Sequence, residues 1–162
     1  MKKSIFALTV LALALALSSC GADKDVVKIG VYEPASGDNG AGGKQETLGV
    51  QYANTVTPTV TINGKEYKVQ LEIVDNESSN DKAVTAASAL VAKNVSLVLG
   101  SYGSGVSIAA SDTFAAAEIP AIGITCTNPQ VTLGNDHYFR ICFLDPFQGT
   151  VLANYAADRF NA

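Results

Sequence analysis

The chain has 162 residues, 48% of them apolar, and a formal net charge of −4 at pH 7. Its 11 basic and 15 acidic residues form no basic stripe, which argues against a nucleic-acid-binding protein. One histidine and three cysteines without a CxxC pair argue against a zinc site, and we expect no metal ion and no cofactor.

The N-terminus has the pattern of an export signal. Two lysines precede an apolar run over residues 5–17, which is too short for a membrane span and suits a signal peptide. The run ends in Leu-Ser-Ser-Cys, which resembles the lipobox of bacterial lipoproteins, and a chance cysteine after an ordinary signal is the alternative. We expect residues 1–19 to be a signal peptide and 20–25 a lipidated linker. Lipid on Cys20 would then anchor the protein to the extracytoplasmic face of a bacterial membrane.

The rest of the chain alternates between strand and helix patterns. Strands that alternate with helices are typical of an α/β protein with a parallel, doubly wound sheet covered on both faces. In chain order the patterns predict a strand over 26–32, a glycine-rich loop over 37–43, a helix over 47–56 with Leu48, Tyr52 and Val56 on one face, a hairpin turning at Asn63-Gly64, a helix over 80–93, a strand over 96–100, a helix to about 117, strands over 120–124 and 138–143, and a helix over 146–159.

Three loops follow the carboxyl ends of predicted strands, where ligands bind in such folds. They are Glu33–Gly43, Ser101–Gly105 and Thr125–Pro129, all rich in glycine, serine, threonine or asparagine. The first is no P-loop, because Asp38 replaces a required glycine and Gln45 replaces the serine or threonine that holds magnesium. We interpret it as a flexible glycine turn that leads into a helix.

A serine hydrolase is the only enzyme that the loops suggest, and the pattern does not favour it. Ser104 has Tyr102 and Val106 where a nucleophile elbow needs glycines. The one candidate base, His137, lies beside a turn, where a histidine is more often a solvated loop residue. We therefore expect no enzymatic activity.

The second and third loops suit a ligand that carries both charges. A helix that begins near Ser104 has free N–H groups and a partial positive charge at its start, which attract a carboxylate. The third loop adds two threonines and backbone carbonyls that can accept from an ammonium group. This combination fits a zwitterionic amino acid. The alternative, that Ser104 only caps its own helix, stays open.

From about Val27 onward the chain resembles the N-terminal part of the leucine/isoleucine/valine-binding proteins. These are solute-binding components of ABC importers with the two-lobed type I periplasmic-binding, or Venus-flytrap, fold. The residues that carry the resemblance are Lys28 to Val31, Ser36-Gly37, Gly43, Val74-Asp75-Asn76, Val98-Leu99-Gly100 with Ser104, Ile119 to Ile122, Thr125 to Pro129, Phe139-Arg140, Asp145 and Gln148-Gly149.

The resemblance implies roles for single residues. It implies that Ser104 holds the ligand carboxylate through its hydroxyl and N–H. It also implies that the carbonyl of Thr125 accepts from the ammonium group and that the side chain of Thr127 contacts the ligand backbone. Gly42 stands where the family often has an aromatic residue against the ligand side chain, and Tyr102 is a candidate to replace it.

The resemblance also implies a domain organisation. Residues 26–144 are expected to form an incomplete N-terminal ligand-binding lobe. Residues 145–162 are expected to form a hinge crossing, with Asp145 as the hinge candidate, and the first helix of a second lobe that is otherwise missing. The whole protein would capture a branched-chain-like amino acid between two lobes and deliver it to a permease driven by an ATPase subunit. A sensor domain on the same fold is the alternative, and a serine esterase comes third.

Two cysteines, Cys126 and Cys142, follow the signal peptide and its lipobox. An extracytoplasmic location permits a disulfide between them. Their spacing in the sequence does not show whether their Cβ atoms approach each other, so the pairing stays open.

Overall fold

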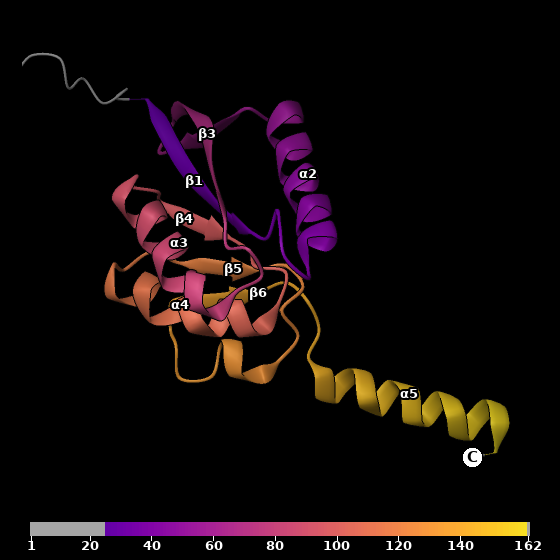
Figure 1. The fold of residues 1–162 in the computed structure, drawn as a ribbon. Coiled ribbons are helices and arrows are strands. Elements are labelled where there is room, and N and C mark those ends of the chain that lie inside the picture. Colours follow the sequence, from indigo (N-terminus) through magenta and orange to yellow (C-terminus); the bar gives the residue numbers. More distant parts are fainter. Residues whose placement is uncertain (1–24, 162) are drawn as a thin grey trace, which may run out of the picture.

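The computed structural model describes residues 25–161, and the expected signal peptide and Cys20 lie outside them (Figure 1). Among these residues no helix is long and apolar enough to cross a membrane. The elements in chain order are β1 (Val26–Glu33), α2 (Gly40–Val56), β2 (Thr59–Ile62), β3 (Lys65–Asp75), α3 (Asn80–Ala92), β4 (Leu97–Leu99), α4 (Ser104–Ala116), β5 (Ala121–Gly123), the 3-10 helix η2 (Pro129–Val131), β6 (Tyr138–Arg140) and α5 (Asp145–Phe160).

The strands form one six-stranded sheet in the order β2-β3-β1-β4-β5-β6. Every neighbouring pair is parallel except β2 and β3, which form an antiparallel hairpin at the edge. The hairpin turns at Asn63 and Gly64, whose φ angles of 51° and 79° suit a type I′ turn. The predicted α/β class with a mostly parallel sheet is confirmed, and so is the hairpin.

The core lies between the sheet and the pair α3 and α4, which cover one face side by side (Figure 1). Tyr32 in β1 and Phe114 in α4 are fully buried there, and their rings meet edge to face with centroids 5.5 Å apart. The Tyr32 hydroxyl donates to the carbonyl of Ala83 in α3. Because side chains alternate along a strand, the neighbours of Tyr32 in β1 point to the opposite face of the sheet.

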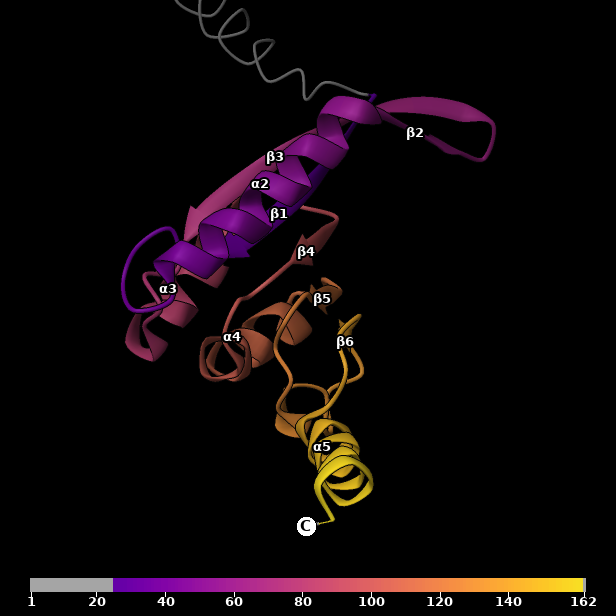
Figure 2. The ribbon, with the colours of Figure 1, turned by 90° about the vertical axis from the view of Figure 1, so that its right-hand side faces the viewer.

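The opposite face of the sheet is covered only in part. Figure 2 shows α2 lying along β1 and β3, whereas β4, β5 and β6 have no helix in front of them on that side. The predicted apolar face of α2 stays largely exposed, with Leu48, Tyr52 and Val56 at 63%, 73% and 63% exposure. α2 therefore buries only Gly40 and Gly43.

α2 begins earlier than its pattern predicts. The sequence placed residues 37–43 in a loop, but the helix begins at Gly40. A Cβ atom on Gly43 would lie 2.2 Å from the carbonyl oxygen of Pro34, so this glycine is needed for close packing of the helix against the end of β1. The predicted last strand is also shorter, because β6 ends at Arg140.

The last helix, α5, leads away from the sheet (Figures 1 and 2). None of its residues is buried, and its apolar side chains Phe147, Val151, Leu152, Tyr155 and Phe160 are all exposed. The residues before it therefore form one lobe without support from α5.

Candidate functional site

The loop after β1 is fastened to the loop after β3. The carboxylate of Asp75 accepts hydrogen bonds from the backbone N–H of Ala35, the hydroxyl of Ser36 and the backbone N–H of Glu77, at 2.7–2.8 Å. Burial alone would raise the pKa of Asp75, but these hydrogen bonds lower it below its usual range. The amide of Asn76 donates to the hydroxyl of Ser101, 2.9 Å away, and so joins this pair to the loop after β4.

Ser104 links the second loop to the third. It is the first residue of α4, and Gly103 precedes it at the N-cap with a φ of 126°. The Ser104 hydroxyl oxygen accepts from the backbone N–H of Asn128 at 3.2 Å, and Asn128 belongs to the third loop. This contact differs from the alternative considered from the sequence, in which the serine caps its own helix. The hydroxyl and the start of α4 thus lie beside the third loop.

Arg140 in β6 organises the third loop. Its guanidinium donates to the carbonyls of Cys126, Asn128 and Pro129, at 2.8, 2.9 and 3.3 Å, and to the hydroxyl of Thr132 at 2.9 Å. Sequence reasoning missed this role, because three of the four partners are backbone carbonyls that any residue would provide. By holding three backbone carbonyls, the arginine stabilises the conformation of the third loop.

The two threonines of the third loop contact different parts of the chain. Thr125 is exposed, and its hydroxyl donates to the Oε1 atom of Glu46 in α2 at 2.5 Å. Thr127 is half-buried, and its carbonyl accepts from the backbone N–H of Asp145 at 3.1 Å. The hinge candidate is therefore hydrogen-bonded directly to the loop that carries the candidate ligand contacts.

Tyr102 lies against Gly42. A Cβ atom on Gly42 would lie only 2.5 Å from Cε2 of the tyrosine ring, so the ring fills the space that a side chain at position 42 would need. The backbone N–H of Tyr102 donates to Oε2 of Glu33 at 2.7 Å. The ring of Tyr102, the candidate to replace an aromatic residue at position 42, therefore lies directly beside that position.

Replacing Gly42 with alanine is expected to displace the ring of Tyr102. The clash is with the far end of a flexible side chain, so the free energy of unfolding should fall by less than about 1 kcal/mol. The ring resonances of Tyr102 in an NMR spectrum should shift. Their assignment is checked by Tyr102→Ala, and unchanged ring resonances would contradict the observed contact.

The two cysteines are free thiols in the structure. Cys126 is buried, and burial raises the pKa of its thiol to about 11, while Cys142 is half-buried. The disulfide considered from the sequence is therefore not formed here. Within residues 25–161 no group of three or more histidine, cysteine, aspartate or glutamate side chains could hold a metal ion.

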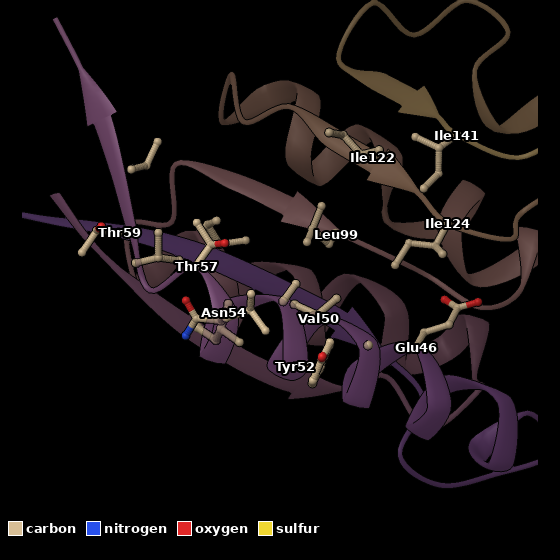
Figure 3. A pocket seen from close by; sticks show the side chains of 17 residues that line it. Glu46, Val50, Tyr52, Asn54, Thr57, Thr59, Leu99, Ile122, Ile124 and Ile141 are labelled. Carbon is tan, nitrogen blue, oxygen red and sulfur yellow. The ribbon is translucent and has the colours of Figure 1, made fainter. Parts of the chain in front are cut away.

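An apolar groove of about 860 Å³ lies between α2 and the uncovered part of the sheet (Figure 3). Its lining includes Val50 from α2 and Leu99, Ile122 and Ile141 from the sheet side, with Glu46 near one end. Parallel sheets are normally covered on both faces. The groove lies where this sheet is not covered, so its floor is exposed sheet surface. It offers few partners for a carboxylate or an ammonium group, and we place the candidate site at the three loops.

Comparison with known proteins gives matches over most or all of the chain. Residues 26–162 match the family model described as periplasmic binding protein. The Leu/Ile/Val-binding protein homolog 1 of Brucella abortus (strain 2308) is 35% identical over 163 residues, which cover 99% of this chain and 43% of that protein. An amino acid binding protein of Pseudomonas aeruginosa is 36% identical over 168 residues, which cover 100% of this chain and 44% of that protein.

Solved structures of other proteins have a similar fold over most of this chain. A leucine binding protein of Thermotoga maritima has a TM-score of 0.75 and 33% identity, over 84% of this chain and 38% of that one. A branched-chain amino acid transporter substrate binding protein of Streptococcus pneumoniae, solved with isoleucine, has a TM-score of 0.75 and 31% identity, over 85% and 39%. The chain thus spans less than half the length of the relatives it matches.

Proposed function

The chain belongs to the periplasmic binding protein family, and we propose that it forms one ligand-binding lobe of the substrate-binding component of an ABC importer for a branched-chain-like amino acid. The observation that carries this proposal is the convergence of the start of α4, with Ser104, on the third loop. The names of the Brucella and Streptococcus proteins, which refer to branched-chain amino acids, add support.

Each end of the amino acid has a partner in the proposed complex. The hydroxyl and N–H of Ser104, at the positive end of α4, hold the carboxylate. The carbonyl of Thr125 accepts from the ammonium group, and Thr127 contacts the ligand backbone. Tyr102 packs against the side chain. No step of this mechanism breaks a bond, and the hydrogen bond that the Ser104 hydroxyl accepts comes from the backbone N–H of Asn128.

Transport follows from closure of two lobes on the ligand. Residues 26–144 form the first lobe, and residues 145–162 form the crossing and a helix of the second. Asp145 acts at the hinge, since its N–H is bonded to the carbonyl of Thr127. The ligand shifts the equilibrium to the closed state because it contacts both lobes only there. The closed protein then delivers the ligand to a permease that an ATPase subunit drives.

The location of the protein is also part of the proposal. Residues 1–19 direct export, and Cys20 carries the lipid that anchors the protein to the extracytoplasmic face of a bacterial membrane. Residues 20–25 connect the anchor to β1, which begins at Val26. This arrangement keeps the lobe near a membrane permease.

Binding can be tested on the chain by NMR titration with L-leucine, L-isoleucine and L-valine. One lobe supplies only part of the contacts, and each lost charged hydrogen bond costs about 1.5–3 kcal/mol, so we expect a Kd of about 1 mM or weaker. The amides of Ser104, Thr125 and Thr127 should shift. 4-Methylpentanoate lacks the ammonium group and 3-methylbutylamine lacks the carboxylate, so each should bind more weakly than leucine. Absence of any shift with all three amino acids would reject the proposal.

Replacing Ser104 with alanine is expected to lower the affinity for the amino acid about tenfold or more, because one charged hydrogen bond is lost. Ser111→Ala is the matched control, since Ser111 lies in the same helix and its hydroxyl donates to the carbonyl of Ile108. The control should bind as the parent protein does. Equal affinities of Ser104→Ala and the parent in the same titration would reject the carboxylate assignment.

A further inference from the structure

Two glutamate side chains are hydrogen-bonded to the second and third loops. Glu33 ends β1 and is 1% exposed, and Glu46 lies in α2 and is half-buried. The two carboxyl groups interact, since a hydrogen bond from one side chain to the other is among the causes that raise the pKa of Glu33. Yet Oε1 of Glu33 and Oε2 of Glu46 are both buried and receive no hydrogen bond from any residue between 25 and 161. Two ionised carboxylates close together repel each other. A proton on one of them removes this repulsion and supplies a hydrogen bond between the two carboxyl groups.

No basic side chain forms an ion pair with this carboxyl pair. In the part of the chain that the structure describes, the ion pairs are Lys65 with Asp25 and Lys93 with Glu72, both elsewhere. With no cation to stabilise the charge, burial is the largest cause that raises the pKa of Glu33, followed by the hydrogen bond and charge of Glu46, and together they bring it to about 9. The backbone N–H of Tyr102 opposes this effect.

Other titratable groups near Glu33 stay neutral over the same pH range. Tyr32 precedes it in β1 and Tyr138 comes from β6, and burial raises the pKa of both phenols well above its usual range. On the side of β4 the neighbour is Gly100, where a Cβ atom would lie 2.6 Å from Oε1 of Glu33. The pair of Glu33 and Glu46 is therefore the group whose charge changes when this cluster loses a proton.

The pair reaches two of the proposed ligand contacts. Oε2 of Glu33 accepts from the N–H of Tyr102 at 2.7 Å, and Oε1 of Glu46 accepts from the hydroxyl of Thr125 at 2.5 Å. Building on the proposed function, we propose that Glu33 and Glu46 are positioning residues that share one proton and thereby hold Tyr102 and Thr125 in place for the ligand. Neither carboxyl group touches the ligand itself.

The first test compares amide and methyl replacements. Glu33→Gln and Glu46→Gln keep a donor and an acceptor at each position, so the affinity for leucine, measured by NMR titration, should stay within about twofold of the parent. Glu33→Ala and Glu46→Ala remove the link and should weaken binding about fivefold or more. Glu66→Gln and Glu66→Ala, at an exposed glutamate of β3, are the matched controls. Glutamine variants as weak as the alanine variants would overturn the proposal, since they would show that a full negative charge is required.

The second test needs no ligand. The pKa of Glu33 is raised to about 9 in the folded protein, from its ordinary value of 4.5 in the unfolded chain. Folding therefore binds one proton between these values, and the unfolding equilibrium constant should rise about tenfold per pH unit there, with no such change below pH 4.5. Chemical denaturation of the parent and of Glu33→Gln from pH 4 to pH 9 measures this, and the variant should lack the added rise. Equal pH profiles would overturn the shared proton.

The two tests separate this inference from the proposed function. If the parent protein binds leucine, and Glu33→Gln and Glu33→Ala both bind it with the affinity of the parent, only the positioning role is overturned. A parent protein that binds no amino acid, yet shows the pH-dependent unfolding, would reject the proposed function and with it the positioning role, and would support the shared proton.

Discussion

Gly100→Ala is expected to lower the free energy of unfolding by about 3 kcal/mol or more. The residue follows β4, with a φ of 122°, where a side chain is strained. A Cβ atom there would lie 2.1 Å from the carbonyl oxygen of Tyr32, in backbone that cannot easily move. The carbonyl of Gly100 also accepts from the hydroxyl of Tyr138 at 2.7 Å, so a shift would disturb the buried end of β6. Urea denaturation of the two proteins measures the difference.

Gly49→Ala is the matched control for this prediction. Gly49 lies inside α2, where a Cβ atom would meet nothing within 4 Å. Alanine is the better helix former, so this variant should gain about 0.5–1 kcal/mol of stability. If both glycine variants were as stable as the parent, the close approach of Gly100 to β1 would be wrong.

Arg140→Met should cost about 3 kcal/mol of stability and should also abolish amino-acid binding. The guanidinium donates three hydrogen bonds to the third loop and one to the hydroxyl of Thr132, and methionine of similar length can replace none of them. The carbonyls of Cys126 and Asn128 would then lack their donor. Thr125 and Thr127, which the proposed site needs, lie in the same loop. Denaturation and the leucine titration together measure both losses.

Arg159→Met supplies the control for charge and size. Arg159 lies in the last turn of α5 and is exposed, so its replacement should change stability by less than about 0.5 kcal/mol and leave binding unchanged. A third loop that stays ordered in Arg140→Met, with amide chemical shifts like those of the parent, would refute the organising role of the arginine.

Local patterns in the sequence predicted the fold class and most of the helices and strands. The alternation of strand and helix patterns predicted the parallel sheet, and Asn63-Gly64 predicted the hairpin at its edge. The prediction of a helix from Ser104 to about 117 agrees with α4, which ends at Ala116. These features depend on neighbours a few residues apart, which is the range over which periodicity and turn chemistry act.

Contacts between distant residues could not be predicted in this way. Thr125 and Glu46 are 79 positions apart, and Tyr102 and Glu33 are 69 apart. Neither glutamate stood out in the sequence, because an acidic residue at the end of a strand or on a helix is usually solvated. The early start of α2 was missed for a related reason, since the packing of Gly43 against Pro34 depends on how the chain turns back after β1.

The uncovered apolar surface beside α2 has a consequence for how stability depends on concentration. A molecule that binds to Leu99, Ile122 and Ile141 binds the folded chain and not the unfolded one. By mass action it therefore raises the melting temperature. A second molecule of the same chain is one such binder, and a detergent monomer is another. Melting temperatures of two variants are therefore comparable only at one protein concentration and in one buffer.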